Sequence, residues 1–117
     1  GAGHMGSHGA MSLVIQAISR RVMHLDTDEK KARAEADDVM AGLCHLPWPV
    51  EIKAGSYEDL KAAQVVVMAA CGAAIEEDRL QELADTLKVT EEVAPRLKEC
   101  GFQGVVVSIS NPCDVIA

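Results

Sequence analysis

The chain has 117 residues, enough for one domain with a core but few for a complete α/β enzyme. A formal net charge of −7 without a basic stripe argues against nucleic acid as a main partner, because phosphate binding needs clustered Lys and Arg. The apolar runs are too short for a membrane span and no signal peptide is visible, so we expect a cytoplasmic protein away from membranes. The four cysteines lack C-x-x-C spacing and predict neither a zinc site nor a redox pair.

A glycine pattern opens the chain. Gly1, Gly3 and Gly6 spell G-x-G-x-x-G, a turn that brings a dinucleotide pyrophosphate to the start of a helix. In that motif a buried strand runs into the first glycine and a helix begins near the third. The alternative is a vector-derived segment, because Gly-His-Met and Gly-Ser-His resemble cloning remnants. Only the dinucleotide motif requires a helix, a strand and an acidic residue to follow.

The next residues meet that requirement. An apolar stretch predicts a helix over about 6–19, and a short run predicts a strand over 21–25. Asp26 ends this strand, 20 positions after Gly6. Its carboxylate can accept hydrogen bonds from both hydroxyls of the adenosine ribose, and no Arg stands beside it for a 2′-phosphate, which favours NAD over NADP. The alternative is that Asp26 caps the following helix.

The remaining elements alternate between helices and strands. The predicted elements are a helix over 28–42, a strand over 50–54, a helical turn over 56–60 capped by Ser56, a strand over 65–70, a long helix over 76–100 interrupted by Pro95, and a strand over 105–109. The apolar run at 65–70 is typical of a parallel strand covered on both faces. A turn at 110–112 follows the last strand.

This alternation predicts an α/β fold with an open parallel sheet and helices on both faces. Ligands of such sheets bind beyond the carboxyl ends of the strands. Three groups of interest lie at such ends, namely Asp26, residues 71–73 and the pair Ser110 and Asn111. We therefore expect a binding site on one rim of the sheet.

Two histidines lie four residues apart in the first predicted helix. His4 and His8 can share one helix face, but no carboxylate or cysteine completes a ligand set. The spacing alone therefore predicts helix-face residues and no metal site.

Several stretches, taken together, resemble the amino-terminal half of L-lactate dehydrogenases and the related L-2-hydroxyisocaproate dehydrogenases. They are GAGHMGSH (1–8), SLVIQAI (12–18), HLDTDEKKA (24–32), IKAGSY (52–57) and ISNPCDVI (109–116). The stretches DRLQEL (78–83) and LKECGF (97–102) lean towards the second group. The resemblance covers nearly the whole chain in order, and implies that residues 1–117 are part of a Rossmann-type, doubly wound NAD-binding domain.

The resemblance also implies roles for particular residues. Those assigned to NAD are Gly1, Gly3 and Gly6 at the pyrophosphate, Asp26 at the adenosine ribose, Ala70 and Gly72 along the dinucleotide, and Ser110 and Asn111 near the nicotinamide ribose. Asn111 would also lie near the substrate. Arg79 matches the family's mobile-loop arginine, which polarises the substrate carbonyl during hydride transfer. The alternative for Arg79 is a surface residue paired with Glu76 or Asp78.

The chain departs from the family pattern around the loop. Residues 73–78 are short and acidic and lack the family's Pro-Gly, and Cys71 stands where Ala or Leu is usual. Malate dehydrogenases place an arginine in this loop, and none is present between Gly72 and Asp78. We therefore expect a small 2-hydroxy or 2-oxo acid with an apolar side chain as substrate, with Ala74 or Ile75 as contacts.

Other parts of the family pattern are absent from these residues. The first strand would precede Gly1, and no His follows His45 to act as the proton-transferring group. We expect two half-sheets with unpaired edges, and no activity from the 117 residues alone. The complete enzyme would be a homo-oligomer, a tetramer or a dimer. The alternative function is a non-catalytic dinucleotide-binding or subunit-interaction fragment.

Overall fold

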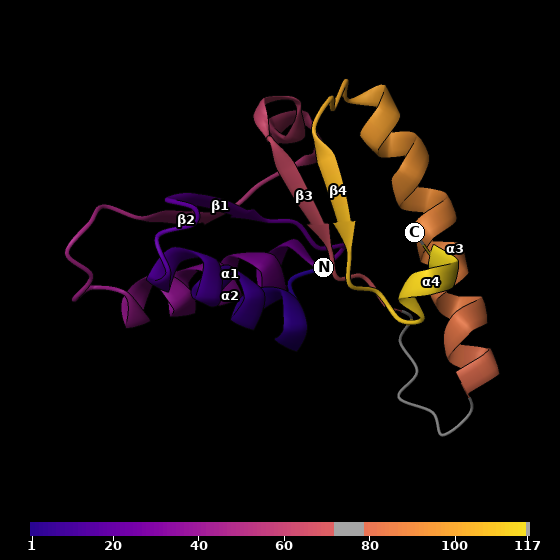
Figure 1. Ribbon diagram of the computed structural model, residues 1–117, viewed down its shortest axis with the longest axis horizontal. Helices are drawn as coiled ribbons and strands as arrows, with labels where there is room; N and C mark the ends of the chain where they lie inside the picture. The colour runs from indigo at the N-terminus through magenta and orange to yellow at the C-terminus, as the bar shows by residue number, and fades with distance from the viewer. Residues whose placement is uncertain (72–78, 117) are drawn as a thin grey trace. The chain divides into compact units, whose positions relative to one another are not determined.

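The computed structural model describes residues 1–71 and 79–116, with the side chains of 79–81 excepted. These residues form two compact units, Gly1–Gly55 and Ser56–Ala117. Each unit contains one pair of parallel strands (Figure 1). This arrangement confirms the Rossmann-type α/β class and the expectation of two half-sheets. None of the described helices is long and apolar enough to cross a membrane.

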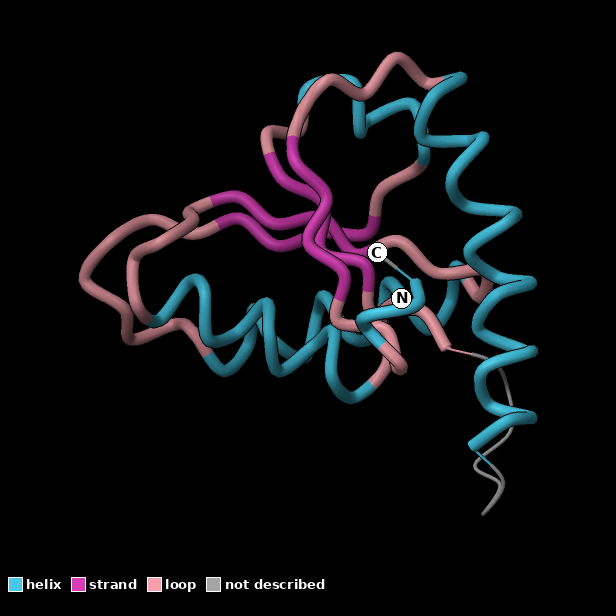
Figure 2. The backbone as a smooth tube through the Cα atoms, turned by 45° about the vertical axis from the view of Figure 1, so that its right-hand side comes forward, coloured by secondary structure: helices cyan, strands magenta, loops and turns pink. Residues whose placement is uncertain are grey.

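The first unit is a two-stranded sheet covered by two helices. Its elements are α1 (His4–Ile15), β1 (Arg21–His24), α2 (Glu29–Gly42) and β2 (Glu51–Ala54). β1 and β2 pair in parallel, with Arg21 opposite Glu51 and His24 opposite Ala54. Both helices lie on the same side of the strand pair, as Figures 1 and 2 show. A connection through α2 is needed here because parallel strands cannot be joined by a tight turn.

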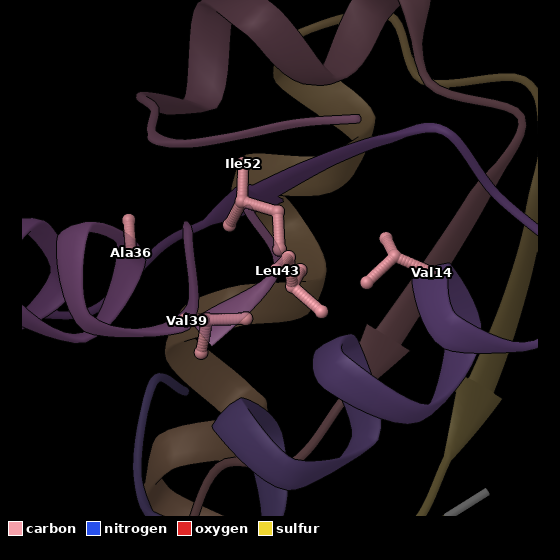
Figure 3. Close-up of a cluster of buried hydrophobic side chains, with 5 residues drawn as sticks. All are labelled: Val14, Ala36, Val39, Leu43 and Ile52. Carbon is pink, nitrogen blue, oxygen red and sulfur yellow. The ribbon is translucent and has the colours of Figure 1, made fainter. Parts of the chain in front are cut away.

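The core of this unit is a small aliphatic cluster. Figure 3 shows its five buried side chains, Val14, Ala36, Val39, Leu43 and Ile52. Val14 comes from α1, Ile52 from β2, and the others lie on or just after α2. Ala36 has no bulk beyond Cβ, so α2 can approach its neighbours closely at that position. The cluster therefore holds α1 and α2 against the strands that carry the candidate site.

The end of α1 differs from the predicted boundary. The helix ends at Ile15, four residues before Ser19, because Ala17 adopts a left-handed φ of 56°. The N–H of Ile18 donates to the Leu13 carbonyl at 2.9 Å, and the N–H of Ala17 donates to Val14 at 3.2 Å. These two bonds form a Schellman motif, which stops a helix and satisfies its last carbonyls.

The second unit contains η1 (Tyr57–Ala62), β3 (Val65–Met68), α3 (Arg79–Glu99), β4 (Val105–Ser108) and α4 (Cys113–Ile116). β3 and β4 pair in parallel from Val65 opposite Val105 to Met68 opposite Ser108. Gly104 precedes β4 at a point where any Cβ would collide with the carbonyl of Gln64. A glycine is therefore required where β4 begins to pair.

Two expectations for this unit are wrong. The helix α3 passes through Pro95 without a break. Pro95 and Glu91 are both exposed, so water can reach the carbonyl at position 91 that loses its usual N–H partner. The strands are also not covered on both faces, since Val65, Val67, Val105 and Val107 are each at least 41% exposed. The beginning of the predicted helix at 76–78 lies outside the described residues.

Candidate functional site

The glycine turn of the first unit leads directly into α1. Gly3 is the N-cap residue, and the helix starts at His4, earlier than its predicted start near Gly6. Within the described chain, no side chain caps this helix start and no acidic residue lies in its first turn. The first N–H groups of a helix and its macrodipole carry partial positive charge. The start of α1 is therefore suited to an anion.

Neither the backbone conformation nor the packing of the described residues requires a glycine at position 3. Its φ of −78° and ψ of −172° are extended backbone that any residue adopts. A Cβ added there would have no heavy atom within 4 Å among the described residues. A ligand that closely approaches the helix start would occupy that open space, and a side chain would obstruct it. This fits the pyrophosphate of a dinucleotide.

Asp26 is tied to this turn by a hydrogen bond. The backbone N–H of Ala2 donates to Asp26 Oδ2 at 2.8 Å, and the N–H of Asp28 donates to Oδ1 at 3.1 Å. The alternative in which Asp26 caps α2 is wrong, because the N-cap is Asp28, whose Oδ1 accepts from the Lys31 N–H at 3.1 Å. The carboxylate at the end of β1 therefore lies beside the glycine turn.

The charge of Asp26 is stabilised by these contacts. Burial, the largest contribution, would raise the pKa of this carboxyl group, but the hydrogen bonds from the N–H groups of Asp28 and Ala2, together with nearby positive charge, hold the pKa below its ordinary value. The positive charge of Lys31 acts in the same direction. Asp26 is therefore ionised at neutral pH and can accept hydrogen bonds from hydroxyl groups.

Contacts beneath the turn were not foreseen from the sequence. Ser7 Oγ, on the buried side of α1, donates to Glu35 Oε2 of α2 at 2.7 Å. His24, the last residue of β1, is only 5% exposed, and among the described residues neither ring nitrogen has a hydrogen-bond partner. Burial lowers the pKa of His24, and the negative charge of Glu35 opposes that shift. The position of Ser7 directly after Gly6 is the one sequence signal for the contacts among Ser7, Glu35 and His24.

The second unit places a further group of predicted residues at the ends of β3 and β4. The carbonyl of Met68 accepts from Ser110 Oγ at 3.2 Å and from the Ile109 N–H at 2.9 Å. Ala70 lies two residues beyond β3. Asn111 is exposed, and its Nδ2 donates to Glu82 Oε1 at 3.4 Å. The residue pair Ser110 and Asn111 therefore sits at the carboxyl end of this strand pair.

The predicted residues fall into two groups. Gly1, Gly3, Gly6 and Asp26 belong to the first unit, and Ala70, Ser110 and Asn111 belong to the second. Arg79 is the first residue of α3. Gly72 and the predicted loop at 73–78 lie outside the described residues. The part of the chain that the structure describes holds no cluster of three or more His, Cys, Asp or Glu side chains suited to a metal ion.

The chain is similar to known proteins. A family model for the NAD-binding domain of lactate/malate dehydrogenases matches residues 1–117. The chain is 33% identical to an L-lactate dehydrogenase of Fusobacterium nucleatum, over 99% of the chain and 36% of that protein. It is 36% identical to an L-lactate dehydrogenase of Halalkalibacterium halodurans, over 100% of the chain and 38% of that protein.

A solved structure agrees with these matches. The ligand-bound minor L-lactate dehydrogenase of Enterococcus mundtii superposes with a TM-score of 0.88 at 26% identity, over 96% of the chain and 36% of that structure. The glycine turn, the carboxylate after β1 and the parallel strand pairs define a Rossmann-type dinucleotide-binding domain. The chain belongs to the lactate/malate dehydrogenase family and represents its NAD-binding domain. It spans between 36% and 38% of the length of the L-lactate dehydrogenases that it matches.

Proposed function

We propose that this chain is the NAD-binding part of an oxidoreductase that interconverts L-2-hydroxy acids and 2-oxo acids by hydride transfer. The substrate is lactate or an analogue with a branched or apolar side chain. The observation that carries the proposal is the open space beside Gly3, at a helix start whose turn is hydrogen-bonded through Ala2 to Asp26. NAD supplies the hydride acceptor or donor, and the chain holds and orients it.

In this proposal the first unit binds the adenosine side of NAD. The N–H groups at the start of α1 donate to the pyrophosphate, and Gly1, Gly3 and Gly6 let it approach. A carboxylate has about four acceptor positions. The two backbone N–H groups occupy one position on each oxygen of Asp26, which leaves each oxygen able to accept from a ribose hydroxyl. Thr27 Oγ1, 3.5 Å from Oδ1, makes only a long contact that such a hydroxyl can replace.

The roles proposed in the second unit follow the family resemblance. Ala70 and Gly72 line the dinucleotide, and Ser110 and Asn111 contact the nicotinamide ribose, with Asn111 also at the substrate. Arg79 polarises the substrate carbonyl and stabilises the charge that develops on its oxygen. We further propose that the full-length protein acts in the cytoplasm as a homodimer or homotetramer. Light scattering would measure the oligomeric state.

The cofactor role of Asp26 is tested by NADH titration of the full-length protein, followed by fluorescence. We expect Asp26→Ala to weaken NADH binding about tenfold or more, since charge-assisted hydrogen bonds contribute about 1.5–3 kcal/mol each. Asp26→Ala should also narrow the preference for NADH over NADPH, because the carboxylate repels a 2′-phosphate. Asp28→Ala is the matched control: it removes the α2 cap and costs about 1 kcal/mol of stability, with NADH affinity unchanged. Equal NADH affinities of the two variants would contradict the proposal.

The substrate class is tested separately by turnover. The full-length enzyme should reduce pyruvate or branched 2-oxo acids with a higher kcat/KM than oxaloacetate. Arg79→Ala should lower kcat with little change in NADH affinity, because the guanidinium acts on the developing oxyanion and not on the cofactor. A preference for oxaloacetate would refute the apolar substrate while leaving NAD binding intact.

A further inference from the structure

Two exposed imidazoles lie side by side on the first turns of α1. His4 and His8 are four residues apart in the helix His4–Ile15, so their side chains leave the same helix face. Their ring centroids are 4.5 Å apart, and the rings are tilted by 57°. Both residues are exposed, so the pair is open to solutes. Neither imidazole is used in the proposed function.

The ring spacing matches that of two imidazoles on one metal ion. With metal–nitrogen bonds of about 2.0–2.1 Å, each ring centroid lies about 3.2 Å from the ion, so bond angles of about 90–110° place the centroids about 4.5–5.2 Å apart. The observed 4.5 Å lies at the lower end of this range. Histidines four residues apart on a helix also supply two zinc ligands in the H-E-x-x-H motif.

The hydrogen bond of His8 prepares its other nitrogen for this role. His8 Nδ1 lies 2.7 Å from the carbonyl oxygen of His4. A carbonyl only accepts, so Nδ1 is the donor, and in the neutral imidazole this tautomer leaves an unshared electron pair on Nε2. Histidines that bind metals commonly donate their second ring nitrogen to a backbone carbonyl in this way.

We propose that His4 and His8 bind a divalent transition-metal ion of the zinc, nickel and copper class. Imidazole nitrogen suits these ions, whereas Mg²⁺ and Ca²⁺ prefer oxygen ligands. The first turn of α1 contains no acidic residue. Two nitrogens therefore hold the ion, and water occupies its remaining positions. Spacing alone does not predict this site; the ring geometry and the His8 hydrogen bond do.

The test is titration of the full-length protein with Ni²⁺ by calorimetry, with a circular dichroism spectrum of each variant. His4→Ala and His8→Ala should each weaken Ni²⁺ binding about tenfold or more, because each removes one of the two protein ligands, and the loss of even an outer partner of a ligand costs about 10- to 100-fold. His45→Ala controls for the other exposed histidine and should leave the affinity unchanged. A double variant, His8→Ala with Gly9→His, keeps the number of histidines but moves one off the shared face, and it should bind as weakly as His8→Ala.

Two results would overturn the proposal. One is wild-type Ni²⁺ affinity in either single variant, and the other is wild-type affinity in the double variant. If His8→Ala does not give the wild-type circular dichroism spectrum, His8→Gln serves in its place, since it retains a polar side chain of similar length. The wild-type melting temperature should rise with Ni²⁺, and that of His8→Gln should not, because only a ligand bound by the folded state stabilises it. An equal rise in both would also refute the site.

Discussion

Replacing Gly3 by Ala should separate folding from cofactor binding. The added Cβ has no heavy atom within 4 Å among the described residues, and the backbone at Gly3 is ordinary extended chain. A small loss of N-cap preference is offset by the lower entropy of the unfolded chain, so stability should change by no more than about 0.5 kcal/mol. The Cβ stands in the space through which we expect the pyrophosphate to approach.

The effect of Gly3→Ala on NADH affinity can be estimated from the hydrogen bonds that the pyrophosphate would lose. Each charge-assisted bond from a backbone N–H to phosphate contributes about 1.5–3 kcal/mol, so losing one raises the Kd for NADH about 10- to 150-fold. NADH fluorescence titration and urea unfolding of the full-length protein measure the two quantities separately.

The matched control is Gly9→Ala, in the interior of α1, whose added Cβ also meets nothing within 4 Å in the described chain. It should raise stability by about 1 kcal/mol with unchanged NADH affinity. If Gly3→Ala binds NADH as tightly as Gly9→Ala does, the phosphate site is not at this turn.

Three further changes test the folded core by urea unfolding. Ala17→Gly should stabilise the protein by about 1 kcal/mol, because Ala17 holds a left-handed φ of 56° that glycine adopts freely; an unchanged midpoint would contradict this. Thr86 is 0% exposed, and within the described residues its hydroxyl lacks a hydrogen-bond partner, so Thr86→Val should stabilise the protein by about 1 kcal/mol. Thr90→Val is the control, and it should not stabilise the protein, because it loses a hydrogen bond to the Thr86 carbonyl. His24 has a pKa lowered from 6.5, so the unfolded chain takes up its proton first and stability should fall as the pH drops below 6.5. His24→Leu should remove that part of the pH dependence, and an identical slope in both proteins would refute it.

Local patterns were sufficient to predict the order of the elements. Helix periodicity and β-branched runs predicted each helix and strand that the structure describes before α4, with boundaries shifted by a few residues. The shifts come from backbone details that periodicity does not encode, such as the left-handed Ala17 that ends α1. The continuity of α3 through Pro95 depends on the exposure of that turn, which the proline itself does not reveal.

The candidate site was predicted in part. The glycine spacing and the acidic residue at the end of a strand identified Gly3 and Asp26, because both are adjacent to recognisable elements. The supporting contacts could not be predicted, since Ser7 and Glu35 are 28 residues apart, and Ala2 and Asp26 are 24 residues apart. Such contacts arise only when packing brings distant segments together.

The sequence by itself determined the α/β class, the glycine turn and the family resemblance, because these depend on residue types at short spacings. The tertiary structure decided that Asp26 anchors the turn through Ala2, that His24 is buried, and that the space beside Gly3 is open. It also decided that the rings of His4 and His8 lie side by side, with Nδ1 of His8 hydrogen-bonded to the His4 carbonyl. The contacts of Asp26 and the burial of His24 follow from the packing of α1 and α2 against β1 and β2 and not from spacing along the chain. The contact between His4 and His8 is local to α1, and it depends on the side-chain rotamers, which spacing does not specify.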